Sequence, residues 1–277
     1  MNNLSIEQQI NEITNYIKSK VKSVPEIGII LGTGLGNFVS VINQQTVIPY
    51  AQIPYLPSTT APGHYGNLIF GEIEQKSVIV MQGRFHLYEG ISPHIATILV
   101  RVMKNLGVKL LINTCASGGL NKNFDAGELL LVTDHINLTA VNPLTGENLE
   151  NFGPRFPVMF DVYDHQFGDL LKTIALENKI KLHSGVYVGI SGPCFCTRAE
   201  SKFYSQIGAD VIGMSLVQEV MVAAHSNIRV LAVATITDMA LFYSHEHKTN
   251  EEMLLISRSM EKSYIELFTK FIAQVKF

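Results

Sequence analysis

The stretch IGIILGTGLG, residues 27–36, joins an apolar run to a loop that has glycine at every second position. A short apolar run that is rich in isoleucine and ends in glycines is typical of a strand buried on both faces. Upstream of it, isoleucines recur at helical spacing from residue 6 to residue 17, and Pro25 ends that pattern. The sequence therefore predicts a helix that leads into a buried strand.

The same pattern of an apolar run followed by small or polar residues recurs along the chain. Apolar residues at helical spacing fill several of the intervals between these runs. Strands that alternate with helices predict an α/β fold with a parallel or mixed central sheet. The further strands predicted are VIVMQG (78–83), LLINTC (110–115), ELLLVTDHI (128–136), SGVYVGISG (184–192), ADVIGMS (209–215) and RVLAVATIT (229–237), and the helices predicted span 93–106, 167–178, 217–226 and 251–276.

Length and composition limit the class of protein. The 277 residues are 47% hydrophobic, and no linker or repeat divides them, so we expect residues 1–277 to form a single domain. A net charge of −3 with no basic run offers no field for a nucleic-acid backbone. Neither a signal sequence after Met1 nor an apolar run of about 20 residues is present, so we expect a cytoplasmic protein with no membrane partner.

The cysteines and histidines do not predict a metal site. Cys115, Cys194 and Cys196 are odd in number, and the C-x-C pair is too tight for a zinc knuckle, so we expect reduced thiols. His245 and His247 form the one histidine cluster, and their spacing of two does not place both rings on one helix face.

The segment GRFHLYEG, residues 83–90, places three different polar side chains at alternate positions. In an extended segment Arg84, His86 and Tyr88 would share one face, opposite Phe85 and Leu87. The simplest interpretation is a half-buried strand with a polar outer face. The alternative interpretation is that these three side chains form a binding surface.

The loop LGTGLG, residues 31–36, is a candidate phosphate cradle. Its glycines let backbone N–H groups approach an anion, and Thr33 adds a hydroxyl donor. A dinucleotide fingerprint needs glycine at position 37, which is asparagine, and no Gly-Lys-Ser/Thr follows as in a P-loop. A simple turn after a buried strand remains the alternative for this loop.

Further segments carry groups that suit an anion. His64 stands between glycines in PGHYG, and Ala116 begins the small-residue run ASGG after a predicted strand. Ser215 lies three residues before Gln218, which is the spacing of a capping box, yet a hydroxyl at a helix start also suits a phosphate. The residues that together supply a guanidinium, imidazoles and hydroxyl donors for one buried inorganic phosphate are Thr33, His64, Arg84, His86 and Ser215.

The motifs quoted above resemble, in order, those of the trimeric purine nucleoside phosphorylases and the related methylthioadenosine phosphorylases. Four further segments continue the resemblance: DHINLTAVNPLTGEN, FGPRFPVM, GPCFCTRAE and GADVIGMSLVQEV. The resemblance runs from about residue 27 to about residue 255. It implies the nucleoside phosphorylase fold, an α/β domain with a central mixed, partly barrel-like sheet flanked by helices. It also implies a homotrimer that cleaves purine nucleosides in purine salvage, with phosphate as co-substrate and neither a metal nor an organic cofactor.

The resemblance also indicates which positions of this chain correspond to the family's site. His86 and Asp238 take the catalytic roles, and Phe156, in the long irregular stretch 139–160, packs over the ribose of a neighbouring subunit. The phosphate site comprises Thr33, His64, Arg84, His86, Ala116 and Ser215; the ribose site comprises Tyr88, Met214, Phe156 and Asn250; and the base site comprises Phe195, Cys196 and Asp238.

Three positions depart from the purine nucleoside phosphorylase pattern. Cys196 stands where that branch has a glutamate that accepts from N1–H of a 6-oxopurine. Asp238 stands where it has an asparagine, and the methylthioadenosine branch has aspartate there. Asn250 aligns with a position where the family has a histidine that contacts the 5′-hydroxyl of the nucleoside. The changes at 196 and 238 suit adenine, whose N1 is an acceptor and whose N6 is a donor, so we expect 6-aminopurine nucleosides to be accepted.

Other functions stay open at this point. A methylthioadenosine phosphorylase would share the motifs and differ at the 5′ end of the substrate. A nucleoside-binding protein without turnover would keep the fold, although the intact Arg84, His86, Tyr88 and Ser215 argue against loss of the site. A nicotinamide-dependent dehydrogenase is a remote alternative, because the glycine fingerprint is incomplete.

Overall fold

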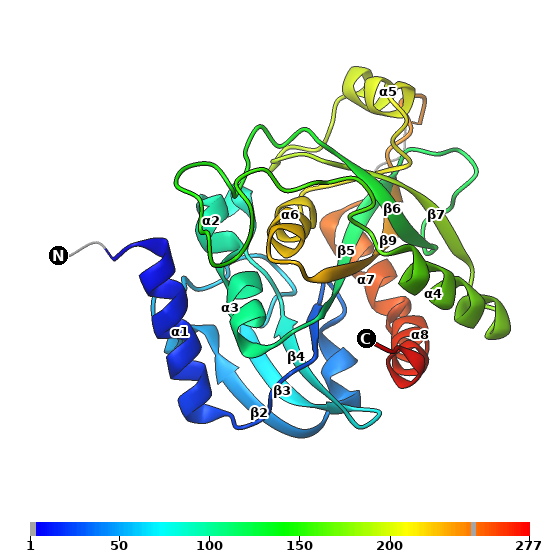
Figure 1. Ribbon diagram of the computed structural model, residues 1–277. Coiled ribbons are helices and arrows are strands. Elements are labelled where there is room, and N and C mark those ends of the chain that lie inside the picture. The colour runs from blue at the N-terminus through cyan, green and yellow to red at the C-terminus, as the bar shows by residue number, and fades with distance from the viewer. Residues whose placement is uncertain (1–3, 245–247) are drawn as a thin grey trace.

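The computed structural model describes residues 4–244 and 248–277. Its helices and strands alternate along most of the chain, as the sequence predicts (Figure 1). The strands are β1 (Ile27–Ile30), β2 (Asn43–Pro49), β3 (Asn67–Ile73), β4 (Lys76–Gln82), β5 (Leu110–Gly119), β6 (Leu129–Asn137), β7 (Leu182–Gly189), β8 (Val211–Gly213) and β9 (Arg229–Met239). The α-helices are α1 (Ile6–Lys20), α2 (Pro93–Ala96), α3 (Ile98–Leu106), α4 (His165–Glu177), α5 (Arg198–Gln206), α6 (Val217–His225), α7 (Asn250–Ser259) and α8 (Glu261–Gln274).

These strands form one mixed sheet in the order β2-β3-β4-β1-β5-β8-β7-β6-β9. Strand β5 also pairs with β9, so β5, β8, β7, β6 and β9 close into a ring and the other four strands extend from it. Strand β1 is parallel to both β4 and β5, whereas β6 is antiparallel to β9. The predicted fold, a mixed and partly barrel-like sheet flanked by helices, is confirmed.

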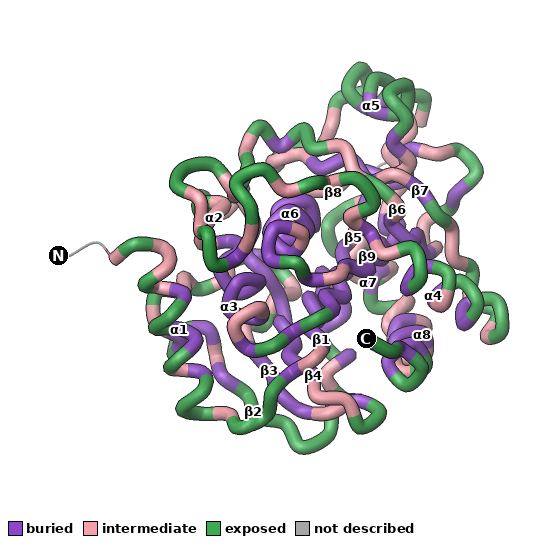
Figure 2. The backbone as a smooth tube through the Cα atoms, in the orientation of Figure 1, coloured by how far each residue is buried: buried purple, intermediate pink, exposed green. Residues whose placement is uncertain are grey.

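Helices cover the sheet on two sides, and each side has its own apolar core. Helices α1, α3 and α6 lie on one side, where Ile10, Ile13 and Ile17 of α1 are fully buried. Helices α4 and α8 lie on the other side, where Phe268 and Phe271 pack. Figure 2 shows that the buried residues follow the strands and the inner faces of these helices. The isoleucine spacing of the first helix is thus a correct prediction.

The structure corrects several predicted elements. Strands β2 and β3 and helix α5 were not predicted. The predicted helix 251–276 is two helices that meet at Met260, and the predicted helix 93–106 divides at Thr97 into α2 and α3. Residues Leu87–Glu89 form a short 3₁₀ turn, so the extended interpretation of residues 83–90 is wrong for its second half. Among the described residues, no helix is both long enough and apolar enough to cross a membrane.

Candidate active site

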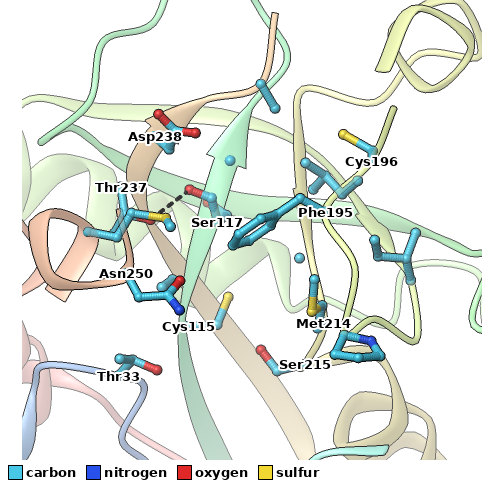
Figure 3. A pocket seen from close by; sticks show the side chains of 18 of the residues that line it. Thr33, Cys115, Ser117, Phe195, Cys196, Met214, Ser215, Thr237, Asp238 and Asn250 are labelled. Atoms are coloured by element: carbon cyan, nitrogen blue, oxygen red, sulfur yellow. Dashed lines mark hydrogen bonds between the residues drawn. The ribbon is translucent and has the colours of Figure 1, made fainter. Parts of the chain in front are cut away.

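A cavity of about 640 Å³ opens where several strands end. Strands β1, β4, β5 and β9 run in the same direction, so the segments that follow them meet at one edge of the sheet. In an α/β sheet this edge is where ligands usually bind. Figure 3 shows side chains around the cavity that come from the loop after β1, from β5 and β9, from the segments after β7 and β8, and from α7.

The cavity gathers residues that are far apart in the sequence. It is lined by all of the predicted phosphate residues, by both predicted catalytic residues and by the three predicted base residues. Of the predicted ribose residues, Tyr88, Met214 and Asn250 line it as well. Phe156 does not line it, and its side chain is 84% exposed on the surface of the chain.

Arg84 lies at the bottom of this site and is only 1% exposed. Its Nη1 donates to Oε1 of Glu219 at 3.2 Å, and its Nη2 donates to the carbonyl oxygen of Thr114. Arg84 also lines the cavity, and a guanidinium there is a suitable donor group for an oxyanion. Sequence reasoning missed Glu219. Its signal was an isolated carboxylate among the apolar residues of SLVQEVMVAAH, where a buried charge needs a partner.

His64 is held in one tautomer beside this arginine. Its Nδ1 accepts from the backbone N–H of Arg84 at 2.9 Å, so the ring proton sits on Nε2, which lies 3.2 Å from Oγ1 of Thr33. The close contact requires glycine at position 83, which has φ +108° and where a Cβ would lie 2.7 Å from His64. Burial, together with the charges of His86 and Arg84, lowers the pKa of His64 to about 3. At neutral pH His64 is an uncharged donor.

His86 is oriented by the carboxylate of Glu89. Oε1 of Glu89 accepts from the backbone N–H of His86 at 2.8 Å and lies 3.2 Å from its Nδ1. Burial raises the pKa of Glu89, but hydrogen bonds from His86 and from Thr60 outweigh it and bring this pKa to about 2. The ionised carboxylate therefore fixes Nδ1–H and leaves Nε2 as the ring nitrogen available to a ligand. The ring also stacks on Tyr88, with centroids 4.7 Å apart.

Ser215 does not cap helix α6, so the capping-box interpretation is wrong. The N-cap position is Leu216, at φ +73°, and it makes no side-chain cap. The Gln218 side chain donates instead to Oγ1 of Thr139 at 2.8 Å. The backbone N–H of Ser215 donates to the buried hydroxyl of Tyr187 at 3.3 Å. Because the chain turns at Leu216, Ser215 lines the cavity together with Met214.

The far end of the cavity is lined by Phe195, Cys196 and Asp238. In the view of Figure 3, Cys196 and Asp238 lie on either side of the Phe195 ring. Burial raises the pKa of the Cys196 thiol, which keeps it protonated and uncharged at neutral pH. Oδ1 of Asp238 accepts a long hydrogen bond of 3.4 Å from the backbone N–H of Lys248. Asp238 also borders the cavity.

His245 and His247 lie outside the described residues. Within the described residues, no group of three or more His, Cys, Asp or Glu side chains could hold a metal ion. Cys115, Cys194 and Cys196 are free thiols. The expected lack of a metal or organic cofactor stays a prediction.

Comparison with known proteins gives a consistent family. Residues 26–273 match the family model described as the phosphorylase superfamily. Purine nucleoside phosphorylase 1 of Bacillus subtilis is 40% identical, covering 97% of this chain and 99% of the relative, and the Bos taurus purine nucleoside phosphorylase is 37% identical, covering 96% and 94%. The Schistosoma mansoni purine nucleoside phosphorylase in complex with adenosine superimposes with a TM-score of 0.93 at 38% identity, covering 98% of both chains. The chain therefore belongs to the phosphorylase superfamily and, within it, to the purine nucleoside phosphorylases.

Proposed function

We propose that this enzyme cleaves purine nucleosides with inorganic phosphate, releasing the free purine and (deoxy)ribose 1-phosphate, and that it serves purine salvage. The observation that carries the proposal is the buried guanidinium of Arg84, set beside the neutral donor His64 and the hydroxyls of Thr33 and Ser215 in one cavity. Such a set of donors suits a small, doubly charged oxyanion. The relatives that carry the purine nucleoside phosphorylase name support the same reaction.

The positions of these residues in the cavity indicate a role for each of them in the reaction. Arg84, Thr33, Ser215 and the backbone at Ala116 hold phosphate at one end of the cavity, and Tyr88 and Met214 place the ribose above it. A phosphate oxygen then bonds to C1′ from the face opposite the purine, while the C1′–N9 bond breaks and its electron pair leaves with the purine. His86 stands between phosphate and ribose. Catalysis comes from positioning and from stabilising the charge that arrives on the base.

The base end of the cavity favours purines with a 6-amino group. A protonated Cys196 thiol presents no negative charge to N1 of adenine. The Asp238 carboxylate, held on one oxygen by a long bond, can accept from the N6 amino group with the other. The adenosine complex of the Schistosoma mansoni relative supports room for adenosine in this fold. Cleavage of methylthioadenosine remains the second candidate, since Asn250, Met253 and Leu254 line the cavity at its α7 side.

The test of this proposal is a panel of inosine, guanosine, adenosine and methylthioadenosine, each incubated with and without phosphate. We expect phosphate-dependent release of free purine from at least one of them, and we expect adenosine among the substrates. Chromatography of the free base measures the product. Nucleoside binding without release of purine from any member would identify a non-catalytic binding protein and overturn the enzymatic proposal.

A homotrimer is also proposed, with Phe156 as the residue that one subunit gives to its neighbour. Three alternate apolar side chains of its loop, Phe156, Val158 and Phe160, are 84%, 75% and 90% exposed, which suits an intersubunit contact. Phe156→Ala is expected to raise the nucleoside KM at least fivefold without lowering Tm. Leu176→Ala, which removes an exposed leucine from α4, is the matched control. A fully active monomer in sedimentation would contradict the assembly.

Residues 1–277 are proposed to form one domain. The single nine-stranded sheet of the described residues and the family match over residues 26–273 support this. The cytoplasmic location and the lack of nucleic-acid partners remain predictions from the sequence.

A further inference from the structure

We propose that Glu219 is a positioning residue, which holds the Arg84 guanidinium in the orientation that binds phosphate. The inference rests on the proposed function, because it concerns the phosphate end of the same cavity. Glu219 lies in the first turn of α6 and is only 4% exposed. It does not line the cavity, so it acts through Arg84.

The guanidinium is held on two of its three nitrogens. Glu219 accepts from Nη1 at 3.2 Å and the Thr114 carbonyl accepts from Nη2, while Arg84 also lines the cavity. An arginine side chain has many rotamers, and a bidentate grip on phosphate needs one of them. Fixing the group before the anion arrives removes an ordering cost from binding.

Of the two partners, Thr114 is the rigid one. Its hydroxyl donates to the Ile30 carbonyl and accepts from the Gly32 N–H, both at 2.9 Å, which ties β5 to the glycine-rich loop. The backbones are in close contact here, since a Cβ at Gly32 would lie 2.8 Å from Cα of Cys115. The Thr114 carbonyl therefore cannot follow a moving guanidinium. The side chain of Glu219 decides where Nη1 lies.

Glu219 also connects Arg84 to the segment that carries Ser215. Helix α6 begins two residues after Ser215, and its first turn holds Glu219. The ion pair between Arg84 and Glu219 therefore connects the loop after β4 to the helix that follows Ser215. A buried ion pair adds little net stability to a fold, so its main effect here is on the orientation of the arginine.

The experiment compares Glu219→Ala, Glu219→Gln and Glu219→Asp. Phosphate KM and nucleoside KM are measured for each, and the Kd of inorganic phosphate is measured independently from the phosphate-dependent rise in Tm. Glu219→Ala is expected to raise phosphate KM and Kd at least tenfold while nucleoside KM stays within threefold. Glu219→Gln keeps an oxygen acceptor at the same reach, so its values are expected within threefold of wild type. Glu219→Asp keeps the charge but falls short of Nη1, so it is expected to behave like the alanine variant.

Each outcome decides the proposal. A folded Glu219→Ala protein with unchanged phosphate Kd would show that the ion pair only stabilises the fold. If Glu219→Gln loses phosphate affinity whereas Glu219→Asp keeps it, then the charge of residue 219 matters rather than its position, and the proposal is overturned. If the alanine variant does not fold, the comparison of Gln with Asp decides. Glu128→Ala, which removes a carboxylate that binds Lys181 and His183 away from the cavity, is the control. Wild type that binds phosphate but releases no purine would overturn the proposed function alone.

Discussion

Arg84→Ala is expected to raise the phosphate KM by about a hundredfold or more, which corresponds to about 2.7 kcal/mol. Two effects add. The dianion loses the guanidinium that faces it, and Glu219 is left buried without its cation at 3.2 Å from where Nη1 was. A carboxylate without a partner beside a dianion in a dry site opposes binding further. Steady-state rates with phosphate varied at saturating nucleoside measure the effect.

Arg101→Ala is the matched control for this substitution. Arg101 is also buried, at 2% exposure, but it binds Thr97 and the Pro143 carbonyl and does not line the cavity. Its loss should leave the phosphate KM of the folded protein within about threefold. Combining Arg84→Ala with Glu219→Gln should recover part of the lost affinity, because the stranded negative charge is then removed. An unchanged phosphate KM in Arg84→Ala would take Arg84 out of the phosphate site.

Asp238→Asn is expected to lower the ratio of kcat/KM for adenosine to that for inosine by about tenfold or more, or about 1.4 kcal/mol. The carboxylate can only accept from the N6 amino group of adenine, whereas the amide can also donate to O6 of a 6-oxopurine. Asp238 lines the cavity, where its carboxylate can meet the base. Competition between the two nucleosides in one reaction measures the ratio directly.

Cys196→Glu should shift the preference in the same direction, because a carboxylate accepts from N1–H of hypoxanthine and repels N1 of adenine. Asp169→Asn, an exposed carboxylate on α4, is the control and should leave the ratio unchanged. A wild-type enzyme that prefers inosine to adenosine by a hundredfold or more would contradict this account of the base site.

The sequence predicted most of the buried strands, but it missed the buried strand β3 as well as the edge strand β2. Strands β1, β5 and β9 are apolar runs that are buried in the sheet, so their composition alone marks them. Strand β2 was missed because most of its residues are exposed and polar, as at a sheet edge, where no inward alternation is needed. The break at Met260 has no glycine or proline to mark it, and the two helices contact different elements, α7 contacting β9 and α8 contacting α4 and β3.

The sequence motifs identified the residues of the site, but they did not predict the backbone conformation that positions these residues. Arg84, His86 and Tyr88 do line one cavity, yet Tyr88 lies in the turn Leu87–Glu89 and not in an extended strand. The spacing of Ser215 and Gln218 fits a cap, but the left-handed turn at Leu216 depends on tertiary contacts. The apolar residues around Glu219 mark it as an unusual carboxylate, but its partner lies 135 positions away in the sequence and is identified only by the structure.

That separation also determines when the site can exist during synthesis of the chain. At ordinary rates of translation, on the order of ten seconds pass between the addition of Arg84 and that of Glu219. In that interval the guanidinium lacks its Glu219 partner, and the ring of strands cannot close because β9 has not been made. Substrate therefore cannot guide the folding of the first half. Bound substrate can therefore stabilise only chains whose synthesis is almost complete.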